Sequence, residues 1–142
     1  MIMSIKTKHA NKIFEGTKTF EYRKKSIGNK NLNKICFIYS SEVDKSIIGY
    51  VIFDYIVSGD FNYIINNTKP EDIDTLKNYF NDRTLCYALH IKEYKKFDKP
   101  ISILDIKKYD KNFVVPQYYR YLKKDEYVYN LLIKISNKKY FF

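Results

Sequence analysis

The chain has 142 residues, 45% hydrophobic and 18% aromatic, with a formal net charge of +10. This apolar content excludes a disordered chain, and the length predicts one domain, residues 1–142, with its own core. No run approaches the about 20 apolar residues of a membrane span, and the first residues lack the apolar stretch of a signal peptide. We therefore expect a cytoplasmic protein that does not enter a membrane.

The cysteines and histidines do not have the spacing of metal ligands. Cys36 and Cys86 lack a nearby partner of the CxxC kind, and His9 and His90 lack one of the HxxxH kind. We expect both cysteines to be small buried residues, with no disulfide, metal or cofactor.

The positive charge has two interpretations. Lysine and arginine neutralise phosphates, so the charge suits a nucleic-acid partner. However, only three of the 26 basic residues are arginines, and an AT-rich genome enriches lysine without any binding role. Nine basic residues fall between Lys6 and Lys34, which favours a basic face near the start of the chain.

The first part of the chain predicts a strand, a short helix and a second strand. Residues 2–6 alternate apolar and polar side chains, as a strand does. We expect Thr7 to cap the following helix and Gly16 to end it in a left-handed conformation. In the second strand, residues 18–24, Glu21 and Arg23 point to the same side.

The middle of the chain is typical of strands separated by polar turns. After a loop at 26–33, residues 34–40 and 46–58 read as buried strands, and Gly49 indicates a bend or close packing. A loop then leads to Pro70, which we expect to open a helix whose buried side chains are Ile73, Leu76 and Phe80.

Strands and helices also alternate in the last part. We expect strands at 84–94 and 100–103, a helix at 116–122 beginning with Pro116, a second helix carrying Val128 to Ile135, and a last strand or docked tail at 139–142. His90 alternates with Leu89 in its strand, so we expect a core or rim histidine rather than a catalytic one. These elements, without regular βαβ order, predict an α+β fold with a small curled sheet or barrel.

Three ordered stretches resemble the ASCH domain family of the PUA-like superfamily, specifically a prokaryotic and phage-associated subgroup. The opening signature S-I-K, then G-x-K-x-x-E-x-R, is matched by Ser4 to Lys6 and by Gly16, Lys18, Glu21 and Arg23. A strand pair ending in Gly49 and the segment 115–122 match later motifs. Thr7, Val115 and Tyr118 depart from the family pattern, where Pro, Pro and Ser are usual.

The resemblance implies a PUA-like β-barrel of mixed strands surrounded by several short helices, with a cleft beside the first helix. In the superfamily this cleft is associated with RNA or modified nucleotides. The candidate binding residues are Ser4, Lys6, Lys18, Glu21, Arg23, Tyr39, Ser40, Gln117, Tyr119 and Arg120. Arginine and lysine would clamp phosphate, the Glu21 carboxylate would accept from an exocyclic amine, and tyrosines would stack on bases.

Three functions remain open from the sequence. The leading one is binding of RNA or a modified nucleotide. The second is a small hydrolase, either a nuclease or an amidohydrolase of acylated cytidine, with Lys18 and Glu21 as catalytic residues. One ASCH branch is such an amidohydrolase, but Glu21 stands where that branch has Thr. The third is a protein-binding factor of a phage or mobile element.

Overall fold

The computed structural model describes residues 1–136, which form two compact units. The first unit contains Met1–Lys18, Lys34–Ile52 and the chain from Glu93 onward, and the second contains Thr19–Asn33 and Phe53–Lys92. Each unit therefore draws on segments that are far apart in the sequence.

The first unit is built on a mixed sheet. Strand β1 (Ile2–Lys6) pairs in parallel with β3 (Ile35–Ser41) and antiparallel with β6 (Tyr119–Arg120). Strand β3 pairs antiparallel with β4 (Ser46–Gly59), and the order across the sheet is β4-β3-β1-β6. Helix α1 (Thr7–Phe14) contacts β1 and β3. Four of the five β1 residues are buried, so the strand is covered on both faces rather than alternating between a buried and an exposed face.

Gly49 allows a close approach inside this unit. A Cβ atom at this position would lie 2.2 Å from the backbone oxygen of Lys95 and 2.8 Å from the Phe14 ring. The β3–β4 register shifts between Ile38, the partner of Gly49, and Tyr39. The predicted close packing at Gly49 is confirmed, because only glycine fits there without moving backbone.

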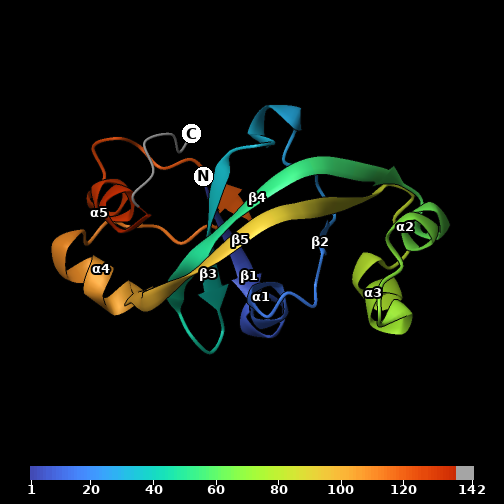
Figure 1. Ribbon diagram of the computed structural model, residues 1–142, viewed down its shortest axis with the longest axis horizontal. Helices are drawn as coiled ribbons and strands as arrows, with labels where there is room; N and C mark the ends of the chain where they lie inside the picture. The colour runs from blue at the N-terminus through green and yellow to red at the C-terminus, as the bar shows by residue number, and fades with distance from the viewer. Residues whose placement is uncertain (137–142) are drawn as a thin grey trace. The chain divides into compact units, whose positions relative to one another are not determined.

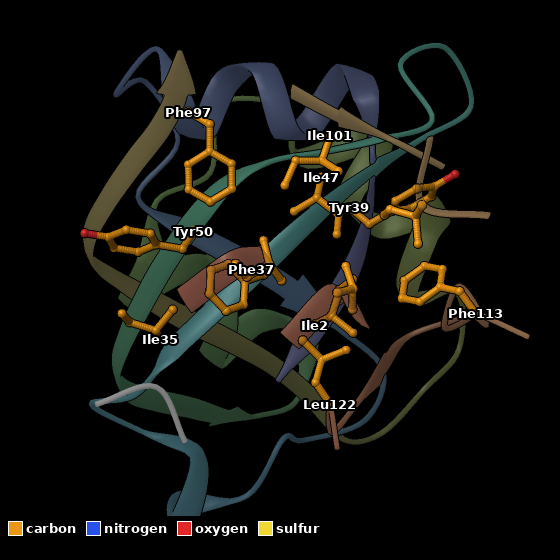
Figure 2. Close-up of a cluster of buried hydrophobic side chains, with 13 residues drawn as sticks. Ile2, Ile35, Phe37, Tyr39, Ile47, Tyr50, Phe97, Ile101, Phe113 and Leu122 are labelled. Atoms are coloured by element: carbon orange, nitrogen blue, oxygen red, sulfur yellow. The ribbon is translucent and has the colours of Figure 1, made fainter. Parts of the chain in front are cut away.

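The core of the first unit combines the sheet with two late helices (Figure 2). Side chains of β1, β3 and β4 pack with Phe97 and Ile101 of β5 (Cys86–Ser102), and α4 (Ile103–Tyr109) and α5 (Tyr127–Ser136) add buried residues. Helices α4 and α5 contact each other (Figure 1). The sequence did not indicate α4, which begins where the predicted short strand at 100–103 ends.

The second unit contains β2 (Phe20–Arg23), which pairs antiparallel with the first half of β5. Helices α2 (Phe61–Thr68) and α3 (Ile73–Phe80) lie against each other (Figure 1) and cover one face of these strands. A short 3₁₀ helix, η1 (Asn29–Asn31), follows β2. The core of this unit is formed by Phe20, Ile64, Leu76, Phe80, Cys86 and Ala88.

Several predicted elements are confirmed. Strand β1 has the expected bounds, β3 is shifted by one residue at both ends, β4 extends one residue further than expected, and α5 carries Val128 to Ile135. Gly16 has a φ of 81°, so it ends α1 in the left-handed conformation that the sequence indicated. Both cysteines are buried and free. The expected strand or tail at 139–142 lies outside the described residues.

Two predictions about helix starts were wrong, and one helix was missed. Thr7 is the first residue of α1 rather than its cap; the cap is Lys6, without a side-chain hydrogen bond. Helix α3 begins at Ile73, because the Asp72 side chain accepts from Thr75 N at 3.0 Å, and Ile73 is 46% exposed. The expected loop before Pro70 contains α2, capped by Asp60.

The predicted helix at 116–122 was also wrong. This segment is extended, and its residues 119–120 form β6 against β1. The backbone N–H of Ser4 donates to the Tyr118 carbonyl oxygen at 2.8 Å. Partners distant in the sequence therefore replace the hydrogen bonds that a local helix would have made.

Candidate functional site

The strongest polar feature among the predicted site residues is a buried ion pair on β2. The Nη2 atom of Arg23 lies 3.0 Å from Oε2 of Glu21, and the two side chains are 16% and 5% exposed. Alternation along the strand places both residues on the same face, as the sequence predicted. A buried charge pair costs several kcal/mol of desolvation per ion, so simple stability does not account for its presence.

Tyr79 of α3 lies beside this ion pair, a neighbour that the sequence analysis missed. Burial raises the pKa of Tyr79; the nearby Arg23 charge acts to lower it and the Glu21 charge to raise it. The Lys24 ammonium lies 4.9 Å from the centre of the Tyr79 ring, and Arg83 Nη2 donates to the Lys24 carbonyl oxygen at 3.1 Å. Three cations and an aromatic ring therefore gather where β2 ends near α3.

Lys18 belongs to the first unit and Glu21 to the second. Lys18 is half-buried, and its backbone N–H donates to the Lys12 carbonyl oxygen at 3.1 Å just after α1 ends. Lys18 and Glu21 are three positions apart in the sequence, so their Cα atoms lie within about 11 Å of each other by chain length alone.

Ser4 connects β1 to the late segment that contains Gln117 and Tyr119. Its hydroxyl donates to the Pro116 carbonyl oxygen at 2.6 Å, and its side chain is buried. Gln117 is exposed, and the half-buried Tyr119 ring makes edge contacts with Tyr118 and Tyr121. Within the first unit, Ser4 lies beside the segment that contains Gln117 and Tyr119. Its hydrogen bonds to the Pro116 and Tyr118 carbonyl oxygens hold this segment against β1.

Ser40 takes part in a hydroxyl network with Thr7. The Ser40 oxygen lies 2.9 Å from Thr7 Oγ1 and 2.8 Å from Oδ2 of Asp44. The Thr7 hydroxyl donates to the Ser41 carbonyl oxygen and accepts from the backbone N–H groups of Val43 and Asp44. The network fixes the turn between β3 and β4 against the start of α1.

Lys6 extends from the end of β1 beside this turn. Its ammonium lies 3.7 Å from Oε1 of Glu42, with the side chains 68% and 54% exposed. Such an exposed pair contributes about 0–1 kcal/mol, so a stronger anion can displace it.

Tyr39 is a core residue rather than an exposed stacking face. It is 5% exposed, and its ring packs in the first unit's core, with the hydroxyl pointing away from the other side chains drawn (Figure 2). Burial raises the pKa of its phenol. The hydroxyl edge is the part of Tyr39 that a ligand could contact.

Arg120 makes an internal ion pair with Glu126. Its Nη1 atom lies 2.9 Å from Oε1 and 3.2 Å from Oε2 of Glu126, and its Nε donates to the Val114 carbonyl oxygen at 2.8 Å. The guanidinium also lies over the Phe113 ring, at 5.1 Å from the ring centre. These contacts hold β6 against the neighbouring chain, so we assign Arg120 a structural role rather than a role in ligand binding.

Within residues 1–136, no group of three or more His, Cys, Asp and Glu side chains is arranged to hold a metal ion. The helices of the described chain are also too short or too polar to cross a membrane.

Comparison with known proteins identifies relatives that match nearly the whole chain. No family model matches. The chain is 27% identical over 128 residues to the "ASCH domain-containing ribonuclease" of Zymomonas mobilis. The alignment covers 88% of this chain and 85% of that protein. The crystal structure of ASCH from Zymomonas mobilis superposes with a TM-score of 0.78 at 25% identity over 93% of both chains.

A tyrosine-to-phenylalanine variant of that protein gives a TM-score of 0.80 at 26% identity, covering 92% of this chain and 94% of the other. The likeness confirms the predicted α+β class, with a small barrel-like sheet of mixed strands and several short helices. The subgroup remains a prediction. Together with the sequence motifs, these relatives support the assignment of the chain to the ASCH domain family.

Proposed function

We propose that this protein binds RNA, with Lys6, Lys18, Glu21 and Arg23 as the candidate binding residues. The observation that carries the proposal is the buried Glu21–Arg23 ion pair, at 3.0 Å on β2. A buried ion pair contributes little net stability, and perturbed charged groups cluster at functional sites, which supports a functional role for this pair. The relative named as a ribonuclease, which matches 88% of the chain, supports RNA as the ligand.

The chemistry of these side chains suits a nucleotide. Arg23 has five N–H donors in a planar fork, a geometry that matches a phosphate or a base edge in a fixed orientation. A carboxylate such as that of Glu21 is the type of group that accepts from an exocyclic amine. Lys6 and Lys18 would add point charges that attract the phosphate backbone.

RNA cleavage is the second candidate function, and the specific observation that favours it is the ribonuclease name of the relative. The amidohydrolase reading has less support, because Glu21 replaces the threonine that this chemistry uses in the related branch. If these residues themselves cleave RNA, Lys18 and Glu21 are the proposed catalytic pair among them.

The test is fluorescence anisotropy with a labelled single-stranded RNA at two salt concentrations, comparing wild type with Lys6→Ala and Lys18→Ala. Both variants should bind more weakly, and each should reduce the salt dependence, since one phosphate contact is lost. Lys107→Ala is the matched control, because it removes the same charge from the exposed face of α4. Equal losses in all three variants would mean that net charge, rather than a site, attracts the RNA.

A further inference from the structure

Asp54 and His90 form a carboxylate–imidazole dyad in the second unit. The Nδ1 atom of His90 lies 2.6 Å from Oδ1 of Asp54, and the two side chains are 27% and 28% exposed. Asp54 comes from β4 and His90 from β5, so rigid strands hold both partners. No residue of this dyad was among the candidate site residues, because the sequence places them 36 positions apart.

The contact with Asp54 fixes which ring nitrogen of His90 carries the proton. An ionised carboxylate only accepts hydrogen bonds, so Nδ1 carries the hydrogen and donates it. The lone pair then lies on Nε2, on the opposite side of the ring. A neutral imidazole oriented in this way is a proton acceptor, and the carboxylate stabilises the imidazolium that forms when Nε2 takes a proton.

Aromatic side chains hold the imidazole ring in place. The Tyr55 ring stacks on it with centroids 4.5 Å apart and an angle of 14°, and Phe20 meets it edge-on at 5.0 Å. Tyr55 is 45% exposed, so it offers apolar surface beside the dyad to a ligand as well. Stacking on exposed aromatic rings is how proteins hold unpaired bases.

The dyad and the Glu21–Arg23 pair belong to opposite faces of the same strands. In the β2–β5 register, Phe20 pairs with His90 and Glu21 pairs with Leu89. Because successive side chains alternate, His90 and Phe20 share one face and Glu21 points to the other. On the His90 face, Ala88 and Cys86 are buried under α2 and α3, whereas His90 lies further along β5 and is partly exposed.

We propose that Asp54 and His90 form a second reactive site, which accepts the proton of a ribose 2′-hydroxyl group in RNA. This inference rests on the proposed RNA function. His90 is the catalytic residue, and Asp54 is a positioning residue that acts through it. The substrate class is single-stranded RNA, because the reaction needs both a 2′-hydroxyl and an adjacent unstacked nucleotide.

The step balances without a metal, oxidant or further reactant. Nε2 of His90 takes the 2′-hydroxyl proton, the 2′-oxygen bonds to the adjacent phosphorus, and the bond from phosphorus to the 5′-oxygen breaks. The imidazolium returns its proton to the departing 5′-oxygen, directly or through water. The products are a 2′,3′-cyclic phosphate end and a 5′-hydroxyl end, and a 2′-deoxy nucleotide at the cleavage position blocks the reaction.

The experiment combines cleavage assays with nitrogen NMR of the histidine side chains. Wild type, His90→Gln, Asp54→Asn and the control His9→Gln are incubated with a short single-stranded RNA, and product ends are identified by mass spectrometry. Long-range ¹H–¹⁵N spectra, assigned with the two histidine variants, report the protonation of each ring nitrogen before and after the 2′-deoxy form of the RNA is added.

The expected result is a loss of kcat of about 100-fold or more in His90→Gln and little change in His9→Gln. Wild-type His90 should show a protonated Nδ1 and a bare Nε2 that shifts when the 2′-deoxy RNA binds. Asp54→Asn should alter the tautomer of His90 and lower kcat more than it changes KM.

Two different failures can be told apart. If RNA binds or is cleaved but His90→Gln behaves as wild type and Nε2 does not shift, the dyad proposal is wrong and the proposed RNA function stands. If wild type neither binds nor cleaves RNA at low salt, the proposed function is wrong and the dyad proposal is overturned with it.

Discussion

The hydroxyl oxygens of Ser40 and Thr7 lie 2.9 Å apart, although 33 residues separate them in the chain. Thr7 also donates to Ser41 and accepts from two backbone N–H groups of the following turn. One small hydroxyl therefore organises the end of β3, the turn and the start of α1. The residue that the family pattern would make a proline is here the centre of a polar network.

We expect Thr7→Val to lower the free energy of unfolding by about 1–3 kcal/mol, because the buried Ser40 hydroxyl and the backbone groups of the turn lose a hydrogen-bonding group and Val supplies none. Urea denaturation followed by circular dichroism measures the change. Thr17→Val is the control, since its hydroxyl bonds to Lys12 on the exposed surface; we expect a change within about 0.5 kcal/mol. Equal effects would contradict a special role for Thr7.

Gly49→Ala should destabilise the protein by about 1–3 kcal/mol or more, because the new methyl group would overlap the Lys95 carbonyl oxygen. Gly28→Ala is a useful comparison. Its φ of 80° strains any side chain, but no atom lies within 4 Å of the added carbon. Thermal melts of both variants separate steric overlap from backbone strain, and Gly28→Ala should have the smaller effect.

Removing one partner of the Glu21–Arg23 pair should cost more than removing both. Arg23→Met leaves the Glu21 carboxylate buried without this ion pair, which we expect to cost about 3–5 kcal/mol. The double variant Glu21→Leu, Arg23→Met should recover part of that loss. A double-mutant cycle in urea measures the coupling. Additive single effects would show that the two charges do not stabilise each other.

Arg120→Ala should lower the melting temperature without weakening RNA binding more than Lys107→Ala does. The lost contacts with Glu126 and Val114 are internal, and charge-assisted hydrogen bonds contribute about 1.5–3 kcal/mol. Anisotropy measured well below the melting temperature checks the binding part. A larger loss of affinity in Arg120→Ala would return this residue to the binding site.

Tyr22 should make stability depend on pH in the alkaline range. Burial raises the pKa of Tyr22 above its usual value of 10.0, although its hydroxyl donates to Thr68 at 3.0 Å. The unfolded chain therefore releases this proton at a lower pH than the folded protein does. The contribution is complete below about pH 10 and is lost as the pH rises through the folded-state pKa.

Denaturation at pH 8 and pH 11 of wild type and Tyr22→Phe measures this contribution. Tyr22→Phe should lose less stability between the two pH values than wild type, because phenylalanine has no proton to release. Val57→Ala, at a partly buried position packed on the same core, controls for destabilisation alone. An identical pH dependence in wild type and Tyr22→Phe would contradict the assignment.

The sequence predicted best where structure is local. Gly16 ends α1 and Gly49 allows close packing, and both features could be predicted because a glycine at that place in the local sequence indicates them. The sequence predictions were wrong where contacts between residues distant in the sequence determine the structure. Pro116 looks like a helix start, yet pairing with β1 holds its segment extended. The expected strands at 84–94 and 100–103 are one strand, since cross-strand pairing carries β5 through the charged stretch between them.

The same difference between local and long-range contacts applies to the candidate site residues. Glu21 and Arg23, two positions apart on one strand, could be paired from alternation alone, and the structure confirms their contact. Asp54 and His90 could not, because their contact depends on how β4 and β5 are aligned. The internal role of Arg120 was also invisible, since it depends on the positions of Val114 and Glu126.

The interleaving of the two units has a consequence for the order in which the chain is synthesised. All segments of the second unit have been synthesised once Lys92 has been added, whereas the first unit still lacks the second half of β5, α4, β6 and α5. Strand β1 therefore lacks its antiparallel partner β6 until the last part of the chain has been synthesised. We expect the first residues made to be among the last to acquire their full set of neighbours, and any early stop of translation to leave β1 with an open edge.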